Sequence, residues 1–132
     1  MFSNSPMAAT FSTNDIVAAE AFYRDVMGAH VKVTDPTMRY LTFDSGAMAF
    51  VYEKDDHMPA NHTVLTFLVP DLAAAAAELK SKGVGLEQLE YTDDDGIARN
   101  MGDDVPPAAW IKDPAGNWIC ITEGTMEDMA GM

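Results

Sequence analysis

The chain has 132 residues, 48% of them hydrophobic, and it carries 8 Lys and Arg against 21 Asp and Glu, a formal net charge of −13. This length and composition predict a single domain over 1–132, and the absence of a long apolar run or a signal-peptide pattern indicates a cytoplasmic location. So acidic a surface, without a basic patch, excludes nucleic acids and anionic membranes as expected partners and is compatible with a neutral or cationic small-molecule ligand.

The first half predicts a strand, a helix and three further strands. A stripe of apolar residues at helical spacing lies between Asp15, a residue suited to a helix start, and Gly28, a residue suited to a helix end. Turn signals at 35–36 and 44–46 separate the later strands. In chain order we expect a strand over 8–12, a helix over 15–28, and strands over 30–34, 38–43 and 47–52.

The second half follows the same order after a polar linker over 54–61. The run of alanines before Gly83 favours a helix that packs closely on a sheet. The acidic segment over 92–106 is long enough to be a lid or the rim of a binding site, or it is a solvated segment without a role. We expect a strand over 62–69, a helix over 71–82, a strand near 84–91, a loop without secondary structure over 92–106, and a poorly ordered tail over 124–132 that contains Met126, Met129 and Met132.

An internal repeat connects the two halves. The segment from Thr10 to Asp15 matches that from Thr66 to Asp71, and the segment from Ser45 to Phe50 echoes that from Ala115 to Cys120. A repeat of this kind predicts two copies of one structural unit. The first module is expected over about 7–53 and the second over about 62–123.

Three motifs resemble the vicinal oxygen chelate superfamily, which includes glyoxalases, bleomycin-resistance proteins and dioxygenases. They are Asn14-Asp15 with the segment 21–28, the segment 66–72, and the segment 113–117, which reads Asp-Pro-Ala-Gly-Asn. The resemblance covers residues 7–123. It implies an α+β fold in which two tandem βαβββ modules form a curled mixed-sheet cup with the helices on its outer face. It also implies a homodimer and a small-molecule ligand inside the cup.

The resemblance also locates the positions that hold a metal in the metal-dependent members of the family. Carried over to this chain, those positions are Ala8 and Phe50 in the first module and Val64 and Cys120 in the second. Divalent cations require nitrogen or oxygen donors that these residues do not offer, and one thiol is not a site. We therefore predict neither a metal nor another cofactor, and Cys120 is expected to be a buried apolar cysteine.

Strand alternation from those four positions turns aromatic and hydroxyl side chains toward the cup. Aromatic walls with a few polar anchors suit a planar, partly apolar molecule. Tyr40, Phe50, Trp110 and Trp118 are the expected walls, and His62, Thr10 and Thr66 the expected anchors. The predicted ligand-binding residues are Tyr40, Met48, Phe50, His62, Val64, Thr66, Trp110, Trp118 and Cys120.

The preferred hypothesis is a metal-free binding protein for a planar or cationic small molecule, resembling bleomycin-resistance-type sequestering proteins, and no catalytic residue is predicted. An alternative is a lyase, isomerase or dioxygenase of the glyoxalase-like superfamily that holds a divalent metal through other donors such as His62 and Glu123. A further alternative is that the aromatic residues only fill the cup or a dimer interface. Whether the protein is an enzyme is left open.

Overall fold

The computed structural model describes residues 1–125 and 127, which form two compact units, Met1–Pro59 and Ala60–Met132. The boundary between the units falls inside the expected linker at 54–61. The assignment of both units to a single domain stays a prediction. We expected a poorly ordered tail that contains Met126, Met129 and Met132. These three residues lie outside the described part of the chain. Among the described residues, no helix combines the length and the apolar composition that crossing a membrane would require.

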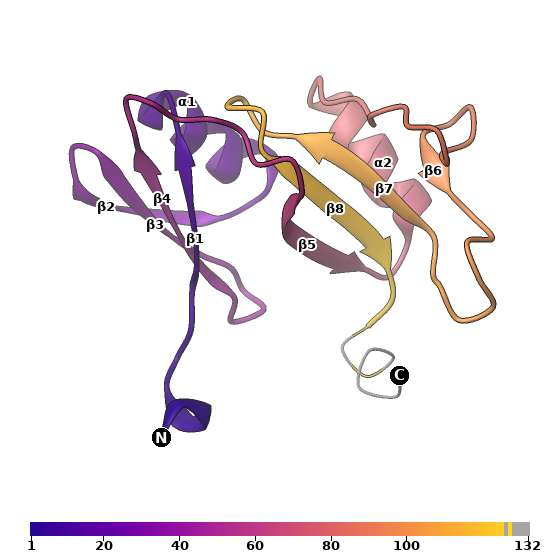
Figure 1. The fold of residues 1–132 in the computed structure, drawn as a ribbon, viewed down its shortest axis with the longest axis horizontal. Coiled ribbons are helices and arrows are strands. Elements are labelled where there is room, and N and C mark those ends of the chain that lie inside the picture. The colour runs from indigo at the N-terminus through magenta and orange to yellow at the C-terminus, as the bar shows by residue number, and fades with distance from the viewer. Residues whose placement is uncertain (126, 128–132) are drawn as a thin grey trace. The chain divides into compact units, whose positions relative to one another are not determined.

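The first unit is a four-stranded sheet with the order β1-β4-β3-β2 and one helical segment (Figure 1). β1 and β4 are parallel, and the other neighbouring strands are antiparallel. The elements are η1 (Phe2–Asn4), β1 (Ala9–Thr13), α1 (Ile16–Ala21), the π-helical turn η2 (Phe22–Val26), β2 (His30–Asp35), β3 (Met38–Thr42) and β4 (Met48–Glu53).

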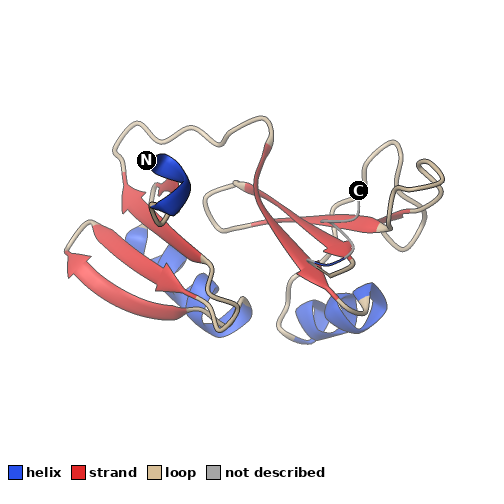
Figure 2. Ribbon diagram, turned by 90° about the horizontal axis from the view of Figure 1, so that it is seen from below, coloured by secondary structure: helices blue, strands red, loops and turns tan. Residues whose placement is uncertain are grey.

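The expected ends of the first helix are confirmed, since Asp15 caps its start and Gly28 follows its end with a φ of +79°. The Asp15 carboxylate accepts hydrogen bonds from the backbone N–H groups of Val17 and Ala18, each at 3.1 Å. The fully buried ring of Tyr23 lies 5.4 Å from the ring of Phe11 on β1. The helical segment therefore covers one face of the sheet and leaves the other face uncovered within this unit (Figure 2).

A partly buried ion pair joins the helix to the sheet in the first unit. Arg39 on β3 is 8% exposed, and its Nε donates to Oε1 of Glu20 on α1 at 2.5 Å. The hydrogen bond and the positive charge of Arg39 lower the pKa of Glu20 from its ordinary value of 4.5. Ionised Glu20 therefore stabilises the folded state.

Replacing Glu20 by Gln is expected to lower the free energy of unfolding at neutral pH and to change it little in acid. A depressed carboxyl pKa contributes stability above the unfolded-state value and loses it as the pH falls through the lowered folded-state value. Urea denaturation of both proteins from neutral pH into acid measures the difference between their free energies of unfolding. This difference should shrink below about pH 4.5. Glu78→Gln is the matched control, because its partner Lys82 is 3.4 Å away and its side chain is 69% exposed. A deficit that stays constant for Glu20→Gln at every pH would contradict the prediction.

The second unit repeats the topology, with the sheet order β5-β8-β7-β6 and parallel pairing of β5 with β8. Asp71 caps its helix, as Asp15 does in the first unit, and the predicted helix over 71–82 is confirmed. The predicted α+β class with two tandem βαβββ modules is thus confirmed. The elements are β5 (Thr63–Val69), α2 (Leu72–Ser81), β6 (Ile97–Ala98), β7 (Ala108–Lys112) and β8 (Trp118–Glu123).

The strand predicted near 84–91 is wrong, and so is the absence of secondary structure over 92–106. The place beside β7 is taken by the two-residue strand β6, whose Ile97 and Ala98 are 5% and 2% exposed. The segment before it bonds to β7 through the N–H of Glu87 and then turns, because the Thr92 hydroxyl bonds both the N–H and the C=O of Leu89. The buried Ile97-Ala98 pair therefore forms the strand, and Glu87 adds a single hydrogen bond to β7. The role of the loop as a lid or rim stays a prediction.

Candidate functional site

Three of the predicted ligand-binding residues form a cluster on the uncovered face of β3 and β4 in the first unit. The rings of Tyr40 and Phe50, which are paired across the two strands, lie 4.9 Å apart. The Tyr40 hydroxyl donates to the sulfur of Met48 at 3.0 Å. Strand alternation therefore brings Tyr40, Met48 and Phe50 together as expected, and all three are half-buried.

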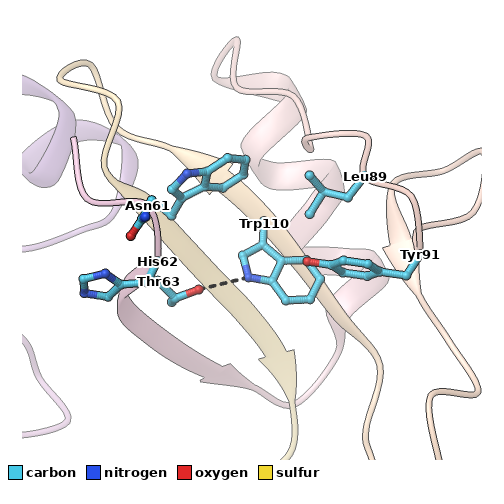
Figure 3. Close-up of a pocket in the computed structure, with 7 residues that line it drawn as sticks. Asn61, His62, Thr63, Leu89, Tyr91 and Trp110 are labelled. Carbon is cyan, nitrogen blue, oxygen red and sulfur yellow. Dashed lines mark hydrogen bonds between the residues drawn. The ribbon is translucent and has the colours of Figure 1, made fainter. Parts of the chain in front are cut away.

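A pocket opens in the second unit with a volume of about 280 Å³, and we call it the tryptophan pocket (Figure 3). Its walls come from the segment before and at the start of β5, from the turn after α2, and from β7 and β8. The three predicted site residues among its lining are His62, Trp110 and Trp118. The full lining is Asn61, His62, Thr63, Leu89, Tyr91, Trp110 and Trp118.

The sheet register positions both tryptophans on the face that α2 does not cover. Trp110 on β7 is paired with Cys120 on β8, and Lys112 is paired with Trp118, so the two indoles lie on adjacent strands and on one face. The indole N–H of Trp110 donates to the Thr63 hydroxyl on β5 at 3.2 Å. This hydrogen bond fixes the Trp110 ring against the edge of the pocket formed by β5 (Figure 3).

Sequence reasoning missed four lining residues. Thr63 faces the pocket because the register of β5 against β8 shifts between Thr63 and Leu65, which breaks the strict alternation along the strand. Asn61 had been assigned to the linker. Leu89 and Tyr91 belong to the segment wrongly expected to be a strand. The Tyr91 ring meets the Trp110 ring edge to face, with centroids 5.4 Å apart and an interplanar angle of 82°. No periodic pattern in the sequence signals this contact.

The electrostatic surroundings of the pocket are mixed but mainly acidic. The Nζ of Lys112 lies 4.5 Å from the centroid of the Trp118 ring, a cation–π contact. The same ammonium is 3.8 Å from a Glu87 carboxylate oxygen. The segment 87–95, which carries Leu89 and Tyr91 into the pocket, holds five carboxylates, and one of these, Asp93, also pairs with Arg99. The field of this segment therefore favours a cation near the pocket.

The remaining predicted site residues lie farther along β5 and β8. Val64 is half-buried at the register shift, and Thr66 is paired with Cys120. Cys120 is 9% exposed, and burial raises the pKa of its thiol to about 11. Without a bound metal the thiol is therefore protonated at neutral pH, and it is not a nucleophilic thiolate there.

The side chains at the four positions that the resemblance predicts for a metal do not fit a divalent cation. Phe50 is paired with Thr10 across β1 and β4, and Cys120 is a protonated thiol between Thr66 and Trp110. The side chains of Ala8 and Val64 offer no donor atom. Within residues 1–125 and 127, no three His, Cys, Asp or Glu side chains are grouped so as to hold a metal ion.

The alternative donor pair His62 and Glu123 is wrong, because the structure places the two residues at opposite ends of β5 and β8. His62 precedes Thr63, which is paired with Trp118, whereas Glu123 is paired with Val69. Six residues of strand separate the two ends, which corresponds to about 20 Å. The Glu123 carboxylate instead accepts a hydrogen bond from the N–H of Leu72 at 3.1 Å and caps α2.

The family model described as Glyoxalase/Bleomycin resistance protein/Dioxygenase superfamily matches residues 7–121. No curated protein sequence matches the chain significantly.

Several solved structures share the fold over nearly the whole chain. A fosfomycin resistance protein, FosX, from Listeria monocytogenes is 13% identical with a TM-score of 0.74, and 97% of each chain is covered. A lactoylglutathione lyase from Agrobacterium tumefaciens is 20% identical with a TM-score of 0.68 and 98% coverage of each chain. A glyoxalase/bleomycin resistance protein from Catenulispora acidiphila is 25% identical with a TM-score of 0.63, covering 90% of this chain and 97% of that one.

Proposed function

Because the chain belongs to the Glyoxalase/Bleomycin resistance protein/Dioxygenase superfamily, we propose that it is a metal-free binding protein for a planar or cationic small molecule. The observation that supports this proposal is the tryptophan pocket, where two indoles and the Tyr91 ring surround a space with polar groups at its rim. Apolar, aromatic walls with few polar groups are typical of small-molecule sites. Trp110, Trp118 and His62 are the proposed ligand contacts that the sequence already indicates.

The size of the pocket limits the ligand. A volume of about 280 Å³ lies just below the range for drug-sized ligands and suits a molecule with one or two rings or a small cationic group. Each stacked aromatic contact contributes about 0.5–1.5 kcal/mol beyond area burial. Contacts to the other predicted residues, and the homodimer and cytoplasmic location expected from the sequence, stay predictions. Those other residues are Tyr40, Met48, Phe50, Val64, Thr66 and Cys120.

The alternative is a divalent-metal-dependent lyase, isomerase or dioxygenase, and the shared fold is the observation in its favour. FosX from Listeria monocytogenes, which has this fold, has been crystallised with Mn(II). The lack of side-chain nitrogen and oxygen donors weighs against this alternative. The four positions that the resemblance predicts for a metal hold Ala8, Phe50, Val64 and Cys120.

N-Methylquinolinium, a planar two-ring cation, is expected to bind with one-to-one stoichiometry and to quench the tryptophan fluorescence. Isothermal titration calorimetry gives the stoichiometry, and fluorescence titration reports on the indoles. Phe43→Leu, a change of a half-buried residue in the first unit, is the control and should bind like the unaltered protein. Elemental analysis of protein purified without chelators tests the alternative. Stoichiometric divalent metal, or a failure to bind across a panel of planar and cationic compounds, would contradict the proposal.

A further inference from the structure

We infer that the tryptophan pocket takes an alkylated ammonium group, such as a trimethylammonium, in preference to a flat ring or a primary amine. The inference rests on the proposed function and narrows its ligand class. It follows from the angle between the pocket's rings, the charge around the pocket and the hydrogen-bonding groups of the lining.

The angle between two of the rings favours a rounded group. The rings of Tyr91 and Trp110 are inclined at 82°, so they form a corner and not a pair of parallel walls. A flat ligand can stack on only one face of such a corner. A compact group of methyls around a positive nitrogen contacts both π faces at once, and each contact gains from the ring quadrupole.

The charge around the pocket favours a cation. The segment 87–95 contains five carboxylates, of which Glu87 pairs with Lys112 and Asp93 pairs with Arg99, and the whole chain carries a net charge of −13. Within the second unit, Trp118 already has a cation against its ring, the Lys112 ammonium at 4.5 Å. An indole of this pocket is therefore placed where it attracts a cation.

The lining distinguishes an alkylated ammonium from a primary one. A primary ammonium carries three N–H donors that need acceptors when water is removed. The lining contains no carboxylate to balance the charge of such a group. Its acceptors are the side chains of Asn61, His62 and Tyr91 and the Thr63 hydroxyl, which already accepts the Trp110 N–H at 3.2 Å. A quaternary ammonium has no N–H donor, so it needs no acceptor from the lining when water is removed from it.

The test compares choline with its uncharged isostere 3,3-dimethylbutan-1-ol and with ethanolamine, by isothermal titration calorimetry of the full chain. Choline should bind at least about fivefold more tightly than either, the size of one cation–π contact. Tyr91→Leu should abolish most of this preference, whereas Tyr91→Phe keeps a π face and should retain it. Equal binding of choline and the uncharged alcohol would overturn the inference.

Lys112→Met gives an independent measure, because Lys112 contacts Trp118 and is not among the lining residues. Removing this like charge should raise choline affinity about twofold and leave the affinity for the uncharged alcohol unchanged. A fall in choline affinity would overturn the inference. Binding of N-methylquinolinium tests the proposed function separately from the ammonium inference. If it binds and choline does not, the ammonium inference fails while the proposed function stands, and if neither binds, both fail.

Discussion

Replacing Asp113 by Ala is expected to lower the free energy of unfolding by about 3 kcal/mol. Asp113 is 5% exposed in the turn between β7 and β8, and its carboxylate accepts hydrogen bonds from the N–H groups of Ala115 and Asn117, both at 2.9 Å. It also accepts from the Asn117 side-chain amide at 3.0 Å. The substitution would leave these donors buried without their acceptor, and this loss is more costly than the loss of an exposed hydrogen bond.

The control for this change is Asp44→Ala in the corresponding turn of the first unit. The Asp44 side chain is 95% exposed, although its carboxylate lies 2.8 Å from the His30 ring nitrogen. An exposed pair of this kind contributes little, so a change below about 0.5 kcal/mol is expected. Urea denaturation of the three proteins measures both effects. A loss of less than about 1 kcal/mol for Asp113→Ala would show that the carboxylate does not hold the turn.

Much of the fold follows from local signals in the sequence. Asp15 and Asp71 each cap a helix, and Gly28 and Gly83 follow the helix ends with φ values of +79° and +81°. Capping and helix termination depend on neighbouring residues, and the sequence therefore contains the information needed to predict them. The internal repeat adds a second prediction of the succession of strands and helix along the chain, because the order predicted for one half applies to the other.

The elements that could not be predicted depend on contacts between distant residues. The segment near 84–91 and the pair Ile97-Ala98 both contain apolar residues and both bond to β7, but Glu87 does so only through one hydrogen bond to Trp110, whereas Ile97 and Ala98 form a strand. The outcome depends on the burial of Ile97 at 5% and on the Asp93 carboxylate, which accepts the N–H of Ile97 at 3.0 Å and shapes the turn before it. The π-helical turn η2 is likewise a departure from regular geometry without a sequence signal.

The candidate site shows the same division. Alternation along β7 and β8 is regular, so the common face of Trp110 and Trp118 could be predicted from the sequence. The pocket's other residues could not, because the register shift in β5 turns Thr63 toward the pocket and an irregular turn brings Tyr91 onto Trp110. The regular strands β7 and β8 thus supply the predictable wall of the pocket, and the irregular start of β5 and the segments between strands supply the remainder.

Trp110→Leu is expected to weaken the binding of N-methylquinolinium by about 30-fold, the effect typical of a central aromatic contact. The substitution removes the ring that meets Tyr91 at 5.4 Å and the N–H that donates to Thr63 at 3.2 Å. It therefore releases two lining segments as well as deleting a wall. Trp118 remains in this variant, so its fluorescence still reports binding.

Trp110→Phe separates the two contributions. This variant keeps an aromatic face against Tyr91 and loses only the hydrogen bond to Thr63, so its affinity should fall by about threefold to tenfold. Trp110 is half-buried, and both variants are expected to remain folded, which thermal unfolding checks. If Trp110→Leu binds N-methylquinolinium within about threefold of the unaltered protein, the ligand does not lie in the tryptophan pocket.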